Sequence, residues 1–370
     1  MSLGYFTLAF LLSVLATPLV FLVMRRLGVV DRPKADKRKI HAKPTPLGGG
    51  WAIWLSFFSV VGLAYAGDNY FGVDVAPKHL LGLFIGSTIL MAGGFLDDKY
   101  TLRARHQILF PVFAALSILA LGVGPHAISN PWGGVIDLSA YKIPVYGLGN
   151  IILLADFIVF FWLMGMMFTT KFLDGLDGLV TGVVAIGALI IFFLSRDPRW
   201  LQPEVALVAL IFAGACLGFL VWNWHPAKIF LGEGGSLFTG FVLGTLAIIS
   251  GGKIATTLLV MGLPALDVVR VIARRAQKKT SVFAGDNEHL HFKLLRSGLS
   301  QRQAVILLYS LSLIFGLSAL VLQTTYKLIA FGILLLVMLL AAAWFARAER
   351  GPQKARTTYE TANSVREKTG

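Results

Sequence analysis

Charged residues and cysteine are both scarce in this chain. Only 14% of its 370 residues are charged, whereas 56% are hydrophobic, and the mean hydropathy is +0.75. This balance excludes an ordinary soluble domain and indicates a polytopic membrane protein. The single cysteine, Cys216, lies in an apolar run, so an intramolecular disulfide is excluded and packing is its expected role.

Acidic residues are fewer than basic ones, 19 against 33, which gives a formal charge of +14. A strongly basic chain can bind nucleic acid, but here the Lys and Arg residues flank hydrophobic runs and form no separate basic domain. Membrane topology and anionic lipid explain such a distribution better. We therefore expect the membrane, and no nucleic acid, as a partner.

The apolar stretches predict an all-α membrane fold with about eleven transmembrane helices. Each stretch is long enough to cross roughly 30 Å of hydrocarbon. They lie at about 3–23, 48–66, 79–96, 107–123, 151–169, 178–195, 204–222, 235–251, 254–272, 303–321 and 327–346.

The distribution of Lys and Arg predicts the orientation of these helices. No basic residue precedes the first span and Arg25-Arg26 follow it, the reverse of a cleavable signal peptide. With the N-terminus outside, 27 of the 33 Lys and Arg residues fall in cytoplasmic segments and six in outer ones. We expect a membrane domain over residues 1–350, with the C-terminus in the cytoplasm. The polar, basic tail 351–370 is expected to be disordered.

Asp174 and Asp177 interrupt two apolar runs in the stretch from Lys171 to Leu179. If this stretch is helical, residues three apart share a face, and the two carboxylates point into one volume. A charge at the centre of a bilayer costs roughly 3 kcal/mol on insertion scales, so such residues commonly mark a site. The alternative is a helix end solvated by lipid headgroups.

Four further polar motifs lie between predicted spans. Asp97-Asp98 end the third span, where the helix dipole disfavours acidic residues. Glycines surround Glu233, His289 and His291 form a His-x-His pair, and Arg38-Lys39-Ile40-His41 precede Lys43, Pro44, Pro46 and three glycines. Taken singly, each motif has an ordinary explanation: a solvated loop, a polar contact or a positive loop at the inner surface.

The order of these motifs relative to the predicted spans indicates on which side of the membrane they lie, which no single motif does. The motifs at Asp97, Asp174, Glu233 and His289 follow the third, fifth, seventh and ninth spans, so all four are predicted to face the cytoplasm. Carboxylates converging with basic groups at a membrane surface suit a divalent cation and a phosphorylated substrate.

Two local features are also predicted. Residues 135–146 of the longest outer loop alternate loosely between apolar and polar side chains, which is compatible with a short hairpin. In the largest inner loop, which contains residues 286–293, a short amphipathic helix should end at Gly298. Ser300 and Gln303 form a capping-box pattern for the tenth span.

Together the motifs resemble the polyprenyl-phosphate N-acetylhexosamine-1-phosphate transferases, the family that includes WecA- and TagO-type enzymes and MraY. The resemblance covers about residues 31–296. It is carried by Arg38-Lys39-Ile40-His41 with Pro44, Pro46, Gly48 and Gly49, by Asp97-Asp98, by Phe172 to Leu179, by Phe230-Leu231-Gly232 with Gly235-Ser236-Leu237, and by His289-Leu290-His291.

The resemblance implies an enzyme that transfers a sugar 1-phosphate from a cytoplasmic UDP-sugar to a polyprenyl phosphate in a prokaryotic plasma membrane, releasing UMP. It also implies Mg²⁺, or Mn²⁺, as cofactor. The His-Leu-His pattern and the eleven spans look more like the WecA-type branch than MraY, which favours GlcNAc 1-phosphate and the start of a cell-envelope polysaccharide. Transfer of another UDP-amino sugar, as in MraY, remains an alternative, and a homodimer is left open.

The resemblance also implies roles for the site residues. Asp97 or Asp98 would orient or deprotonate the lipid phosphate, while Asp174, Asp177 and Glu233 would form the metal and nucleotide side, with Asp174 and Glu233 as metal ligands. Lys43, Lys171, His289 and His291 would offset phosphate charge. Direct attack and a two-step route through an aspartyl phosphate both remain open.

Three positions depart from the family pattern. This chain has Lys171 where Asn is common, Glu233 where Asp is common, and Phe292 in place of a further His. Two explanations follow for the first pair. Either the Lys171 ammonium pairs with Glu233 in the position of the metal, or Glu233 still binds Mg²⁺ while Lys171 contacts the diphosphate or an aspartate. We favour the second, because an ammonium is a weaker bridge between phosphate oxygens.

Two other classes of protein compete with this interpretation. A secondary transporter also has many spans, intramembrane charges and helices broken by glycine. It predicts charges near the bilayer midplane and an internal repeat, whereas the charges here gather at one surface and no repeat is evident. A catalytically inactive lipid-binding relative would share the fold but release no UMP.

Overall fold

The computed structural model describes most of the membrane domain. It covers residues 2–33, 44–68, 71–72, 74–124, 127–129, 135–138, 142–145, 149–251, 253–277, 289–322 and 326–340. The expectations for residues 38–41, for Lys43 and for the tail 351–370 fall outside these described residues.

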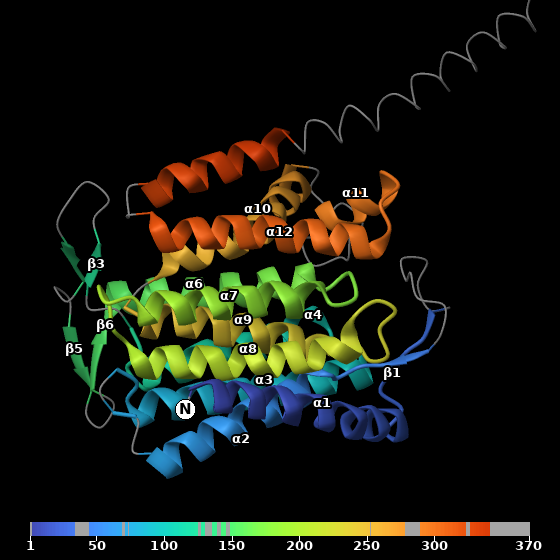
Figure 1. Cartoon of the computed structure of the whole chain (residues 1–370), viewed down its shortest axis with the longest axis horizontal. Coiled ribbons are helices and arrows are strands. Elements are labelled where there is room, and N and C mark those ends of the chain that lie inside the picture. The colour runs from blue at the N-terminus through green and yellow to red at the C-terminus, as the bar shows by residue number, and fades with distance from the viewer. Residues whose placement is uncertain are drawn as a thin grey trace, which may run out of the picture.

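Helices dominate the described chain (Figure 1). The labelled helices are α1 (Ser2–Arg26), α2 (Gly50–Asp68), α3 (Pro77–Tyr100), α4 (Ala104–Gln107), α5 (Leu109–Ala120), α6 (Leu153–Leu173), α7 (Leu179–Arg196), α8 (Pro203–Asn223), α9 (Gly232–Ile249), α10 (Ile254–Gln277), α11 (Leu290–Arg296) and α12 (Gln301–Val321). A further apolar helix, Tyr326–Leu340, follows α12.

Nine helices in the described part of the chain are long and apolar enough to cross a membrane. Two shorter apolar helices, Ala104–Ala120 and Tyr326–Leu340, lie where the fourth and eleventh spans are expected. At 1.5 Å per residue Ala104–Ala120 is about 26 Å long, less than the roughly 30 Å of a hydrocarbon core, and the last helix is described only as far as Leu340. The polytopic helical fold is confirmed, while the total of eleven spans and the side of each terminus stay predictions.

The described strands are short and pair only with a neighbour in sequence. β1 (Val30–Asp31) pairs with β2 (Thr45–Pro46), β3 (Ala127–Ser129) with β4 (Val135–Asp137), and β5 (Lys142–Val145) with β6 (Gly149–Ile152), all antiparallel. The hairpin expected within residues 135–146 is therefore wrong. β4 and β5 lie in that stretch, but each pairs outward with a different partner.

The helices lie side by side around α9 (Figure 1). Nearly every residue of α9 is buried, and it packs mainly against α3 and α6, while α8 packs against α1 and α7. In Figure 1 the strands β3, β5 and β6 gather at one end of the bundle, and β1, α4 and α11 lie at the other. The two ends of the bundle are thus structurally different.

Glycine allows α2 and α3 to approach the first turn of α9 very closely. A Cβ atom on Gly94 of α3 would lie 2.0 Å from the backbone nitrogen of Gly234, and one on Gly50 would lie 2.3 Å from the Cα of Gly235. The glycines around Glu233 thus admit the neighbouring helices, and this brings the C-terminal end of α3 to the N-terminus of α9.

The predicted caps near α11 and α12 are confirmed. α11 ends at Arg296 and is followed by Gly298 with a φ of +100°. Ser300 caps α12 through a full capping box with Gln303.

Replacing Gly94 with Ala should destabilise the fold, because the added methyl group has no space between α3 and α9. Overpacking of this kind commonly costs about 1–3 kcal/mol. Thermal unfolding in detergent should show a clear drop in apparent Tm for Gly94→Ala. The matched control is Gly165→Ala in α6, where a Cβ meets nothing within 4 Å. Equal melting temperatures for the two variants would contradict the close packing.

Candidate functional site

Asp98 lies at the C-terminal end of α3 but at the N-terminal end of α9. Its carboxylate accepts hydrogen bonds from the backbone N–H of Glu233, at 3.1 Å to Oδ1 and 3.3 Å to Oδ2. An acidic group is disfavoured at the end of its own helix, but the N-terminus of another helix stabilises it. The apparent misplacement of this charge is therefore resolved by tertiary contact.

Asp97 points toward the connection between α3 and α4. Its Oδ1 accepts hydrogen bonds from the backbone N–H of Leu102 at 2.7 Å and from Nε2 of Gln107 at 3.0 Å. The two adjacent aspartates thus have different partners, and Asp97 holds the turn that follows α3.

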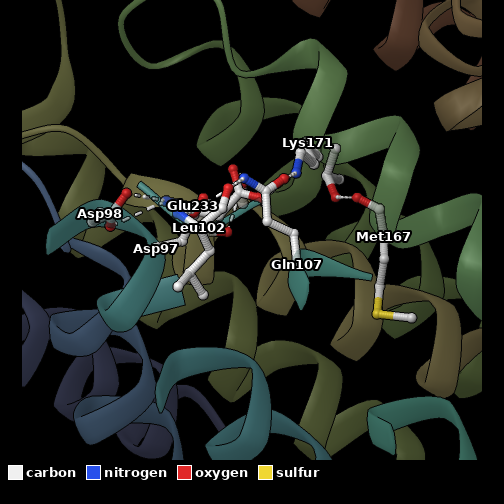
Figure 2. Close-up of polar contacts among 9 residues, drawn as sticks. Asp97, Asp98, Leu102, Gln107, Met167, Lys171 and Glu233 are labelled. Atoms are coloured by element: carbon white, nitrogen blue, oxygen red, sulfur yellow. Dashed lines mark hydrogen bonds and ion pairs between the residues drawn. The ribbon is translucent and has the colours of Figure 1, made fainter. Parts of the chain in front are cut away.

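Lys171 links these elements to α6 (Figure 2). Its ammonium forms an ion pair with Glu233 and donates a hydrogen bond of 3.2 Å to Oε1 of Gln107. Both charged side chains are mostly enclosed, with 20% and 19% of their side-chain surface exposed. Lys171 lies in the last turn of α6 and Glu233 in the first turn of α9, so both side chains are carried by helix ends.

Residues 174–178 form a turn between α6 and α7, so the helical path considered for this stretch is wrong. Gly178 has a φ of +77°, which ends any helical path before α7. Asp177 Oδ2 contacts Nδ1 of His225 at 2.6 Å and accepts a hydrogen bond of 3.1 Å from the Ala227 N–H. Asp177 therefore fastens the loop between α8 and α9 to this turn.

Asp174 has a solvent-exposed side chain, and the described residues form no hydrogen bond or ion pair with its carboxylate. The protein packed around it, followed by repulsion from Glu233 and Asp177, raises the pKa of Asp174 above its ordinary value. Asp174 is the carboxylate of the cluster that is left free for a ligand.

The two histidines belong to a separate network that meets the same turn. His289 Nδ1 contacts Oδ2 of Asp267 at 2.9 Å, and the Leu290 N–H donates to the same oxygen at 2.9 Å. The rings of His289 and His291 stack with centroids 5.6 Å apart. A Cβ on Gly175 would lie 2.2 Å from Nε2 of His291, so this imidazole packs directly on the turn beside Asp174.

His291 is buried, and its Nε2 has no hydrogen-bond partner among the described residues. Burial, with the neighbouring His289 as the second cause, lowers the pKa of His291 to about 3. His291 is therefore neutral at physiological pH. The role expected for it, offsetting phosphate charge, would have to be performed as a neutral hydrogen-bonding group.

The segment that follows the first basic loop also reaches the site. The Gly49 N–H donates to the Phe230 carbonyl at 2.8 Å, and the Gly50 N–H donates to the Leu231 carbonyl at 2.9 Å. In return, the Phe230 N–H donates to the Pro46 carbonyl at 2.9 Å. The described end of this loop is thus fixed beside the first turn of α9, while Lys43 itself lies outside the described residues.

Four contributors to this region were not predicted. Gln107 connects Asp97 with Lys171, Asp267 orients His289, and His225 contacts Asp177. Asn223 accepts hydrogen bonds from the Gly178 N–H and the Thr181 hydroxyl, both at 3.1 Å. Asp267 had a usable signal, because an acidic residue inside an apolar span commonly marks a site. The others are ordinary polar residues whose partners are distant in sequence.

The residues present fit a magnesium ion only with help from a substrate. Among the described residues, no three His, Cys, Asp or Glu side chains are grouped so that they could hold a metal ion. Mg²⁺, however, is often bound by one or two carboxylates together with waters and substrate phosphates. Asp174 and Glu233 offer two such carboxylates, with Lys171 already paired to the second.

Comparison with known proteins identifies the family. The chain is 30% identical over 328 residues to a probable undecaprenyl-phosphate N-acetylglucosaminyl 1-phosphate transferase of Bacillus subtilis, covering 86% of this chain and 84% of the relative. A family model described as glycosyl transferase family 4 matches residues 80–251. The chain belongs to glycosyl transferase family 4.

Two further relatives are similar at the same level. A decaprenyl-phosphate N-acetylglucosaminephosphotransferase of Mycobacterium tuberculosis is 30% identical over 329 residues, with 81% of this chain and 77% of the relative covered. A phospho-N-acetylmuramoyl-pentapeptide-transferase of Desulforamulus reducens is 29% identical over 330 residues, with 84% and 92% covered. The resemblance inferred from the motifs is confirmed.

The buried, neutral state of His291 predicts a pH effect on stability. Its folded pKa lies below the ordinary value of 6.5, so between pH 6.5 and about 3 the unfolded chain binds more protons, and stability falls as pH falls. This contributes about 1–2 kcal/mol between pH 6.5 and 5. The apparent Tm of His291→Gln should therefore fall less than that of the unmodified protein over this interval. Parallel pH profiles would contradict the prediction.

Proposed function

We propose that this protein transfers a sugar 1-phosphate from a UDP-sugar to a polyprenyl phosphate at the cytoplasmic face of a bacterial plasma membrane. The observation that carries the proposal is the gathering of Asp98 and Asp174 near Glu233, whose carboxylate is paired with the Lys171 ammonium, at one end of the helical bundle. Membership of a family whose similar members are named as phosphotransferases of polyprenyl phosphates supports it.

The reaction brings two anions together. An oxygen of the lipid phosphate attacks the β-phosphorus of the UDP-sugar, and the bond from that phosphorus to the bridging oxygen breaks. The bridging oxygen leaves with UMP, and the product is a polyprenyl diphosphate carrying the sugar. Positioning and charge compensation provide most of the catalysis in such a transfer.

The protein residues would act mainly through charge and position. Asp98 would orient the lipid phosphate or accept its remaining proton, a modest demand because a second phosphate pKa lies near 6. Lys171 would offset negative charge on the diphosphate. His289 and His291 would approach the substrates from the side of Gly175, with Asp267 fixing the first imidazole.

Glu233 and Asp174 would hold a divalent ion, Mg²⁺ or Mn²⁺, completed by diphosphate oxygens. When bound, the ion would neutralise the diphosphate and stabilise UMP as leaving group. Asp177 fits a supporting role, because its carboxylate already contacts His225 and the Ala227 N–H.

For the donor sugar we favour UDP-N-acetylglucosamine. Two of the similar relatives are named for that sugar, and one is named for a phospho-N-acetylmuramoyl-pentapeptide. Transfer of a different UDP-amino sugar is the second candidate. A transporter is disfavoured because the charged residues gather at the helix ends on one side of the bundle and not along a central path.

UMP release tests the proposed function. Purified protein in detergent with undecaprenyl phosphate should release UMP from UDP-N-acetylglucosamine and form a lipid-linked sugar detectable by mass spectrometry. The same assay with the UDP-N-acetylmuramoyl-pentapeptide tests the second candidate. Absence of UMP with both donors, in protein that remains folded, would overturn the proposal.

Asp98→Asn and Asp97→Asn should each lower turnover by at least about 10²-fold, the low end for a proton-transferring group. Asp98→Asn removes the charge held at the N-terminus of α9, and Asp97→Asn disturbs the link to Gln107. The control is Asp156→Asn, because Asp156 accepts a hydrogen bond from the Ile152 N–H at the start of α6, the opposite end of that helix from Lys171. Near-normal rates in both test variants would show that neither aspartate takes part in the transfer reaction.

A further inference from the structure

Lys171 and a divalent ion would compete for the same carboxylate. The Lys171 ammonium is ion-paired with Glu233, which is one of the two carboxylates suited to a metal. Like charges repel strongly in such an enclosed site, so the ammonium and the ion cannot share the Glu233 oxygens at low energy. Binding of the ion therefore requires Lys171 to leave Glu233.

A second anchor determines where Lys171 goes. Nε2 of Gln107 donates hydrogen bonds of 3.0 Å to Oδ1 of Asp97 and 3.0 Å to the Leu102 carbonyl. With both donors used there, the amide oxygen faces Lys171 and accepts from its ammonium at 3.2 Å. Gln107 thus gives the Lys171 ammonium a second contact besides Glu233 (Figure 2).

The surrounding charges explain why an ammonium is stable at this position. Asp98 and Asp174 both lie close enough to Glu233 for mutual repulsion. The Lys171 ammonium neutralises the Glu233 carboxylate and so lowers its repulsion toward the other two. A metal ion therefore gains less by binding Glu233 than it would at an unpaired carboxylate.

We propose that Lys171 is an internal competitor of the divalent ion and that Glu233 exchanges one cation for the other when substrate binds. In the unliganded protein Glu233 holds the ammonium. When the ion arrives with the diphosphate, Lys171 moves off Glu233, stays tethered to Gln107 and faces the phosphate charge. This inference rests on the proposed function and adds that the protein binds a free divalent ion weakly.

Direct binding of Mn²⁺ tests this competition without any turnover. The Mn²⁺ bound by purified protein is measured from the loss of the free-ion signal in electron paramagnetic resonance. Lys171→Met should bind Mn²⁺ at least about tenfold more tightly than the unmodified protein, equivalent to about 1.4 kcal/mol. Adding Glu233→Gln to Lys171→Met should abolish that gain.

Lys99→Met is the matched control. Lys99 is exposed, follows Asp98 directly, and lies near the rings of Phe95 and Tyr100. It tests whether any lost positive charge near the aspartates strengthens Mn²⁺ binding. Its affinity should equal that of the unmodified protein, and a gain matching that of Lys171→Met would overturn the proposal.

Unchanged or weaker Mn²⁺ binding by Lys171→Met would also overturn the proposal that Lys171 competes with the ion. If that variant does not fold, Lys171→Gln provides the same loss of charge with a polar side chain and is scored in the same way. Failure of the competition between Lys171 and the ion can be distinguished from failure of the proposed transferase activity. Tighter Mn²⁺ binding without UMP release by the unmodified protein would reject the transferase, whereas UMP release with unchanged Mn²⁺ affinity would reject only the competition.

Discussion

The contact between α3 and the first turn of α9 is the constraint on which the site depends. Gly94 and Gly234 let the two backbones meet, and the Asp98 carboxylate then accepts the Glu233 N–H. A helix N-terminus offers unpaired N–H groups and a partial positive charge, and here an acidic side chain from a neighbouring helix uses both. Without this approach, the Asp98 carboxylate would lie at the unfavourable end of its own helix.

The carboxylates near this contact have different partners. Asp98 accepts a hydrogen bond from a helix N-terminus, and Asp97 accepts hydrogen bonds from a backbone N–H and a side-chain amide. Glu233 is paired with a lysine ammonium, and Asp177 contacts an imidazole and a backbone N–H. Asp174 has no such partner among the described residues and remains exposed. A cluster built in this way is stable alone and still presents a free carboxylate, as a site for phosphorylated substrates requires.

The histidine network reaches the cluster through packing and not through charge. Asp267 in α10 contacts His289 through its carboxylate, and the ring of His289 stacks on that of His291. The His291 imidazole in turn packs against Gly175. Gly175 directly follows Asp174, so a movement of α10 or α11 would also move the Asp174 carboxylate. Segments about a hundred residues apart in sequence are thus in direct contact at this turn.

The sequence by itself determined the class of the fold and predicted most of the charged residues that the structure brings together. Apolar runs of membrane length must be helices, because a bilayer offers no water to unpaired backbone groups. The regular placement of Asp97, Asp174, Glu233 and His289 after alternate spans predicted that they would gather, and the described structure brings all four regions into one chain of contacts.

Only the tertiary structure decided which group pairs with which. The departures at Lys171 and Glu233 were visible in the sequence, but their ion pair depends on how the end of α6 meets the start of α9. Gln107 carried no signal, because a polar residue beside a membrane span has many ordinary uses and its partners here are Asp97 and Lys171. Contacts between distant segments depend on helix packing, and sequence periodicity describes only one helix at a time.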